Sequence, residues 1–175
     1  MALVVETGAI VTGANAYVTL AEFKAYIGTI PLPAATDPAY ENAIINATRY
    51  LDGKYRQRWQ GFRVQPTIQP LEWPRLFVPF AGAAPGYAPG LAYASYLPSN
   101  AIPQRLKDAT CEAALRALSG PLAIDADTSV ASKKIDVLET TYRPGAIPKQ
   151  LTYQVIDQLL SDYLKPLGSC DAVRG

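Results

Sequence analysis

The chain has 175 residues, of which 49% are hydrophobic and 18% are charged, and its formal net charge is +1. This length suits a single domain over residues 1–175, which can bury a core without help from a metal or a disulfide framework. The near-neutral charge excludes a global field that would draw the chain onto nucleic acid or anionic lipid. A surface with few charges favours contact with other proteins. No stretch approaches the roughly 18 apolar residues of a membrane span, so we expect no membrane partner.

The first two helices are marked by their start signals. Residues 19–27 open with a capping box, in which Thr19 is the N-cap and Glu22 lies three residues on. Asp37 followed by Pro38 indicates a second start. This helix is predicted to run to about residue 52, where Gly53 permits a break, with resumption through Trp59 as the alternative. Its predicted inward face contains Tyr40, Ala43, Ile44, Ala47, Tyr50 and Leu51.

A basic and aromatic stretch, RYLDGKYRQRWQGFR, covers residues 49–63. It could be a nucleic-acid surface, since unpaired bases stack on aromatic rings while Arg and Lys meet phosphates. Alternatively, Tyr50, Trp59 and Phe62 are buried and the cations lie over the end of a helix bundle as struts. Helical spacing favours the second interpretation. The cations that could face DNA are Arg49, Lys54, Arg56, Arg58 and Arg63.

The stretch LEWPR, residues 71–75, has the same two interpretations. We expect Trp73 to fill a core site, with direct nucleic-acid contact as the alternative. We expect Arg75 to form an ion pair with Glu72 or Asp52.

Residues 62–102 are predicted to form a long apolar excursion rich in Pro, Gly and Tyr. Repeated prolines forbid a long helix or a central strand there. No charged residue occurs from Leu76 to Gln104. Disorder usually accompanies high charge and few aromatics, so we expect this segment to be ordered against a neighbouring subunit or partner. The residues expected at intersubunit or tail-facing contacts are Phe77, Phe80, Tyr87, Tyr93 and Tyr96.

The second half of the chain predicts two more helices and a β element. A helix should start at Pro103 and stop at Gly120. Residues 133–142 are rich in β-branched residues and predict a strand or hairpin arm. The last helix covers residues 150–164, and an extended tail follows over 165–175. The predicted inward face of this helix contains Leu151, Val155, Ile156, Leu159, Leu160 and Tyr163. The fold class is therefore mainly α: a small bundle of about four helices with a short β element and a long Pro/Gly/Tyr-rich loop.

The chain lacks the residues of most catalytic sites. It contains no histidine, so the commonest general base and metal ligand is absent, and Ser-His or Cys-His pairs are excluded. Its two cysteines, Cys111 and Cys170, lie too far apart for a metal-binding spacing and fit a reducing compartment. We expect no catalytic residues, no cofactor and no metal, and hence no enzyme.

Several motifs together resemble a family from tailed bacteriophages and prophages. They are ANAYVTLAEFKAYI, ATRYLDGKYRQRWQGFRV, LEWPR, IPQRLKDATCEAALRAL, KKIDVLETTYRPG and QVIDQLLSDYL. Members are often labelled DnaT-like single-stranded-DNA-binding proteins, and the family is also similar to head–tail connector (adaptor) proteins. Residues 76–98 depart from the pattern, because the segment is longer and more apolar.

The adaptor resemblance implies a structural virion protein at the neck between capsid and tail, made in the host bacterial cytoplasm. It implies a ring of about twelve copies that lines the DNA channel. The implied partners are the portal protein, the next neck or tail-completion protein, and passing double-stranded DNA without sequence specificity. The DnaT-like label implies instead a replication accessory protein that coats single strands. We favour the adaptor.

The end of the tail has too few apolar residues to fold alone, and such segments commonly order on a partner. We therefore expect it to bind the portal. Its residues are Leu167, Gly168, Ser169, Cys170, Asp171, Ala172, Val173, Arg174 and Gly175.

Overall fold

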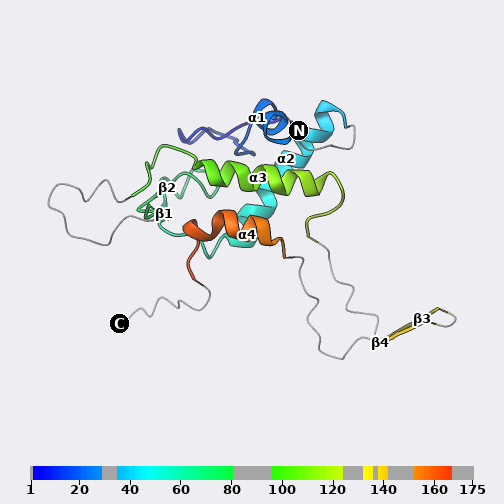
Figure 1. Cartoon of the computed structure of the whole chain (residues 1–175). Coiled ribbons are helices and arrows are strands. Elements are labelled where there is room, and N and C mark those ends of the chain that lie inside the picture. Colours follow the sequence, from blue (N-terminus) through cyan, green and yellow to red (C-terminus); the bar gives the residue numbers. More distant parts are fainter. Residues whose placement is uncertain are drawn as a thin grey trace, which may run out of the picture.

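The computed structural model describes residues 2–28, 35–80, 96–123, 132–135, 138–141 and 152–166 (Figure 1). The helices are α1 (Leu20–Ile27), α2 (Asp37–Tyr55), α3 (Gln104–Ala117) and α4 (Gln154–Leu160), and a 3-10 turn, η2 (Ser161–Tyr163), extends the last of them. The strands are β1 (Phe62–Arg63), β2 (Arg75–Leu76), β3 (Ser132–Ile135) and β4 (Leu138–Thr141). The mainly α fold class is confirmed.

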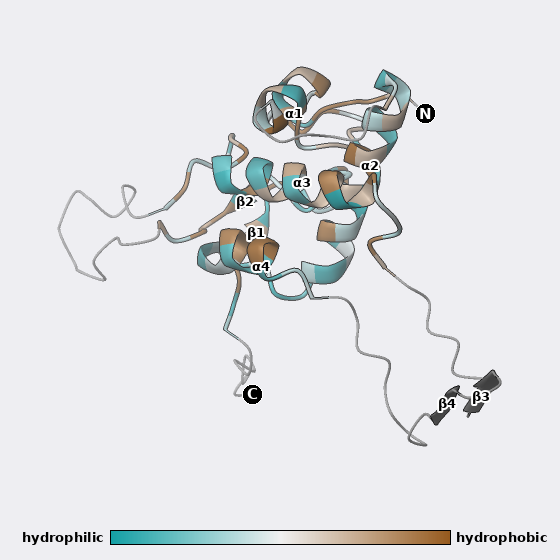
Figure 2. Cartoon of the chain, turned by 45° about the vertical axis from the view of Figure 1, so that its right-hand side comes forward, coloured by the Kyte–Doolittle hydropathy of each residue, from teal (hydrophilic) through white to brown (hydrophobic). Residues whose placement is uncertain are grey.

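Helix α3 is central to the bundle. It packs on both α2 and α4, and Figure 1 shows it passing across them. Small residues on its inward face allow close approach of the neighbouring helices, and Leu106 fills the space between them. The buried residues of α3 are Leu106, Ala109, Thr110, Cys111, Ala113 and Ala114. In Figure 2 each helix carries both hydrophobic and hydrophilic residues, as helices with one buried face should.

Helix α2 begins where Asp37 and Pro38 predict, with Thr36 at the N-cap position. It continues past Gly53 and ends at Tyr55, about one turn later than expected. The extra turn is stabilised by burial, because Tyr55 is fully enclosed in the core. Tertiary packing here outweighs the weak helix propensity of one glycine.

Helix α1 has the predicted capping box. The Thr19 hydroxyl accepts a hydrogen bond from the Glu22 N–H at 3.1 Å, and the Glu22 carboxylate accepts one from the Thr19 N–H at 2.7 Å. Phe23 and Ile27 are the buried residues of this helix.

Helix α4 is shorter than predicted. It begins at Gln154, and Ile156, Leu160 and Tyr163 point inward as expected. The expectation that Val155 lies inward is wrong, since its side chain is 44% exposed. A short helix buries one narrow row of side chains. In α4 this row is set by Ile156 and Leu160, so the side chain of Val155, one position before Ile156, faces solvent.

The first residues of the chain form a loop fixed by a buried carboxylate. Glu6 accepts hydrogen bonds from the backbone N–H groups of Gly8, Ile10 and Val11 at 2.8–2.9 Å. Gly8 packs so closely against Asn100 that a Cβ atom would lie 2.1 Å from the Asn100 carbonyl oxygen. The loop thereby holds the segment that leads into α3.

The β structure consists of two antiparallel pairs. Strand β1 pairs with β2, and β3 pairs with β4 in a hairpin at the predicted position. Between β1 and β2, within the predicted excursion, Leu71 and Trp73 are buried. Among the described residues, no helix is both long enough and apolar enough to cross a membrane.

Candidate functional site

Two of the four aromatic rings in the basic–aromatic stretch 49–63 are inside the protein, and Tyr50, expected in the core, is only partly buried. Tyr55 is fully buried, Trp59 is 2% exposed, and Tyr50 is half-buried. The prediction that Trp59 is buried is therefore confirmed. The parallel expectation for Phe62 is wrong, because its side chain is 70% exposed. Helical spacing no longer applies beyond Tyr55, and on β1 neighbouring side chains point to opposite sides.

Four rings form a chain of edge contacts at this end of the core. The ring centroids of Tyr55 and Trp59 are 5.7 Å apart, those of Trp59 and Trp73 are 5.7 Å apart, and those of Trp73 and Tyr163 are 5.6 Å apart. Trp73 is fully buried, which confirms its prediction as a core residue. Rings enclosed in this way cannot act as stacking platforms for bases.

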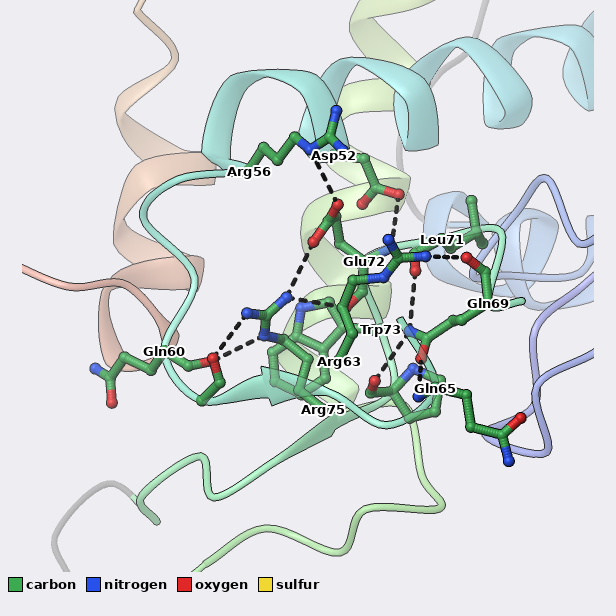
Figure 3. Close-up of polar contacts among 12 residues, drawn as sticks. Asp52, Arg56, Gln60, Arg63, Gln65, Gln69, Leu71, Glu72, Trp73 and Arg75 are labelled. Atoms are coloured by element: carbon green, nitrogen blue, oxygen red, sulfur yellow. Dashed lines mark hydrogen bonds and ion pairs between the residues drawn. The ribbon is translucent and has the colours of Figure 1, made fainter. Parts of the chain in front are cut away.

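Several cations of the stretch are engaged within the protein. The Arg56 Nε atom lies 3.5 Å from Glu72, and the Lys54 ammonium lies 3.5 Å from Asp157. Arg63 donates to the backbone carbonyl of Gln69 (Figure 3). The Arg58 guanidinium lies over the ring of Tyr55 at 6.0 Å.

The neighbouring Arg75 is a buried strut, as predicted. Its guanidinium donates to the Glu72 carboxylate at 3.0 Å and to the carbonyls of Gln60 and Gly61, each at 2.8 Å (Figure 3). These bonds tie the segment after α2 to the Trp73 turn. Removal of one member of such a buried pair leaves an uncompensated charge.

Asp52 completes this polar cluster. Its carboxylate accepts hydrogen bonds from the Tyr17 hydroxyl at 2.6 Å and from the Glu72 N–H at 3.1 Å. Burial raises the pKa of Asp52 to about 7, and the charge of Glu72 adds to this rise, whereas the two hydrogen bonds and Arg63 oppose it.

Three of the cations named as possible DNA contacts have no carboxylate within ion-pair distance among the described residues. They are Arg49, Arg58 and Arg63. Arg49 is exposed on α2. The five cations of the stretch therefore do not form one continuous basic patch, because Lys54 and Arg56 are paired with carboxylates.

Phe77, Phe80 and Tyr96, which we call the aromatic foot, lie within the uncharged segment 76–104. Their side chains are 59%, 55% and 43% exposed. The rings of Phe77 and Tyr96 meet edge-on at 5.8 Å, and the Leu97 N–H donates to the Val78 carbonyl at 2.9 Å. Tyr87 and Tyr93, which belong to the same prediction, lie outside the described residues.

A hollow that the sequence did not predict lies beyond the last residue of α3. We call it the α3 hollow, and its volume is about 540 Å³. A second hollow of about 450 Å³ shares Gly120 and Pro121 as its wall. The lining residues of the α3 hollow are Asn46, Arg49, Tyr50, Ala117, Gly120, Pro121, Leu122 and Ala123. The only sequence signal for it is the Gly-Pro pair after α3, which also fits an ordinary turn.

The predicted portal-binding residues 167–175 lie outside the described residues, but the chain leading to them is anchored. Trp59 and Leu164 form an antiparallel bridge. The Lys165 N–H donates to the Arg58 carbonyl at 2.6 Å, and the Gln60 N–H donates to the Tyr163 carbonyl at 2.9 Å. The tail therefore leaves the protein beside the basic–aromatic stretch.

The described residues contain no group of three or more Cys, Asp or Glu side chains placed to hold a metal ion. Cys111 is buried, and burial raises the pKa of its thiol to about 12, which keeps it protonated and unreactive.

One of the comparisons with known proteins identifies a family. No curated protein and no solved structure matches this chain. One family model matches residues 1–175, and its description is "Putative DnaT-like ssDNA binding protein". The match covers the whole chain, so the protein belongs to this family of DnaT-like proteins.

Proposed function

We propose that the protein is a head–tail adaptor, a structural virion protein that forms a ring of about twelve copies under the portal and lines the DNA channel. The observation that carries this proposal is the aromatic foot. Phe77, Phe80 and Tyr96 are exposed, and they lie in a segment that has no charged residue from 76 to 104. Exposed apolar groups of this kind mark contacts with other proteins.

The arrangement of the cations also supports a structural role. Arg56, Lys54 and Arg75 are paired with carboxylates of the same chain, and the tryptophans beside them are buried. Double-stranded DNA that passes without sequence readout needs only a surface without strong charge of either sign. The protein is proposed to have no catalytic activity.

The partners in this proposal are further copies of the chain, the portal protein and the next neck or tail-completion protein. Residues 167–175 would insert into or against the portal. A tail that orders on its partner loses conformational entropy but can wrap a large surface.

The test is a mass measurement of the protein alone and mixed with the portal protein encoded in the same genome. We expect complexes with portal rings, and we expect a variant that lacks residues 167–175 to remain folded without binding them. A truncated protein that caps portals normally would contradict the role of the tail. Failure of the full chain to bind portal would contradict the adaptor.

Single-strand DNA binding is the second candidate, and the family description favours it. The cations without carboxylate partners limit its strength. Arg49, Arg58 and Arg63 could each meet one phosphate. At roughly −0.7 per phosphate, three contacts give a slope of about −2 when the logarithm of affinity is plotted against the logarithm of salt concentration.

Titration of a fluorescent oligothymidylate at several salt concentrations separates the two candidates. The adaptor proposal expects weak affinity at physiological salt. Tight binding with a slope of about −3.5, the value for five phosphate contacts, would favour the single-strand function and require all five cations of the stretch.

A further inference from the structure

The aromatic foot and the α3 hollow lie at opposite ends of one helix. Tyr96 precedes α3, and Pro121 follows it. Figure 1 shows β2, which leads into Phe77, near the first turn of α3 and far from its last turn. A helix of 14 residues is about 21 Å long. The foot of one protomer is therefore separated from its own hollow, so a contact between them must join two copies.

The two surfaces match in chemistry. The foot offers three rings, one hydroxyl and no charge, whereas the hollow is lined by Ala117, Pro121 and other uncharged groups. The hollow also contains Arg49, which has no carboxylate within ion-pair distance among the described residues. A guanidinium of this kind binds the face of an aromatic ring.

Tyr50 supplies a polar group to the same contact. Its hydroxyl is shielded from solvent and has no hydrogen-bond partner in the described part of the chain. A buried hydroxyl without a partner is energetically unfavourable. Solvent does not reach this hydroxyl in the free protomer, so the Tyr96 hydroxyl of a second copy can bond it only when the Tyr50 side chain turns toward the hollow that it lines.

The foot is held in an unusual backbone conformation. Phe77 has φ +57°, which is left-handed and rare for a bulky residue. Its ring is also fixed edge-on against Tyr96. Strain of this kind is concentrated at functional positions, and a prearranged surface loses less entropy on binding.

We propose that the aromatic foot of one copy seats in the α3 hollow of the next, so that copies associate head to tail. This inference rests on the proposed function and names the two mating surfaces of its ring. In such a contact each added copy still presents one free foot and one free hollow. Association therefore continues until the rotation closes a ring.

Disulfide crosslinking tests the pairing. The variant combines Pro79→Cys, an exposed position beside the foot that leaves its three rings in place, with Ala123→Cys in a Cys170→Ser background, and Cys111 stays buried. We expect oxidation of the concentrated protein to give a ladder of dimers, trimers and larger species on a denaturing gel. The matched control replaces Ala123→Cys by Val155→Cys, an exposed site on α4. A yield no higher than the control overturns the inference.

A mixing experiment checks the direction of association and is independent of the crosslink. Phe77→Asp removes a working foot, and Ala123→Trp fills the hollow. Each variant alone should stay monomeric by sedimentation at a concentration where the parent associates, whereas an equimolar mixture should form dimers that grow no further. Association of either variant alone contradicts the head-to-tail contact. The contact is also contradicted when neither the parent nor the mixture associates.

Portal binding distinguishes the two proposals. If the cysteine variant binds portal but gives no ladder, the head-to-tail inference is wrong and the adaptor stands. If it gives a ladder without binding portal, the adaptor is wrong and the contact stands. Crosslinking of Pro79→Cys to portal alone assigns the foot to the portal and overturns the inference.

Discussion

At the scale of single residues, two aromatic side chains three positions apart have opposite environments. Trp59 is 2% exposed between Tyr55 and Trp73, whereas Phe62 is 70% exposed on β1. Composition alone gives both the same hydrophobic character. Their difference arises because the chain, which has already left α2 at Tyr55, bends at residues 60–61, so that one ring faces the core and the other faces solvent.

These two positions make a matched pair of substitutions. Trp59→Ala should lower the free energy of unfolding by about 3–5 kcal/mol, the range for emptying a large aromatic site. Phe62→Ala should change it by less than about 0.5 kcal/mol, as surface substitutions do. Urea unfolding measures both. Equal losses at the two sites would mean that Trp59 is not part of the core.

The Asp52 carboxyl gives a pH dependence of stability. Its pKa is raised to about 7, chiefly by burial, so the folded protein retains a proton that the unfolded chain releases near pH 4. The folded state is therefore favoured at low pH by this group, and that contribution is lost as pH rises from about 4 to about 7, by at most about 1.4 kcal/mol per pH unit. The groups that face it are Tyr17, Glu72 and Arg63.

Asp52→Asn removes the titrating group. We expect the free energy of unfolding of this variant to depend less on pH between about 4 and 7 than that of the parent, whatever its absolute value. Urea unfolding at several pH values provides the comparison. An unchanged slope would assign the dependence to other carboxyl groups.

At the scale of elements, helix starts were predictable because capping is local. The Thr19–Glu22 box and the Asp37–Pro38 start need only neighbouring residues. The buried strut from Arg75 to Glu72 also follows from short spacing. The bridge between Trp59 and Leu164 could not be predicted, because it joins distant segments through backbone groups that every residue has. The α3 hollow depends on tertiary packing for the same reason.

The N-terminal loop provides a test at this scale through two glycines. Gly8 and Gly13 both have positive φ, but a Cβ atom at Gly8 would collide with Asn100, whereas none would meet an atom within 4 Å at Gly13. Gly13→Ala should cost about 1–2 kcal/mol from backbone strain alone. Gly8→Ala should cost more and should lower the melting temperature further. Equal effects would show that the loop does not pack against the segment before α3.

At the scale of the whole molecule, the described charged side chains are mostly paired with one another, and charged residues are absent from residues 76–104. Most described cations have a carboxylate partner in the chain, and the exposed aromatic foot has no charged neighbour in sequence from 76 to 104. The sequence predicted this absence of charge directly. It did not predict that Phe77 and Tyr96, far apart in the chain, would meet.

Hydrogen exchange tests whether this surface is covered in the assembled state. The amides of Phe77, Val78 and Phe80 should exchange faster in the free protein than in the portal-bound ring, because assembly should exclude water from the foot. Residues 20–27 of α1 serve as an internal reference. Identical protection of residues 77–80 in both states would count against a contact at the foot.

The bridge between Trp59 and Leu164 also has a mechanical consequence. A force applied to the chain beyond Pro166 would reach the backbone bonds between residues 58–60 and 163–165 before it reached α4. Because Trp59 is wedged against Trp73, that load passes into the most tightly enclosed part of the core. The tail is thus fixed at its base, and a pull on it would be resisted by the core around Trp59 and not by α4 alone.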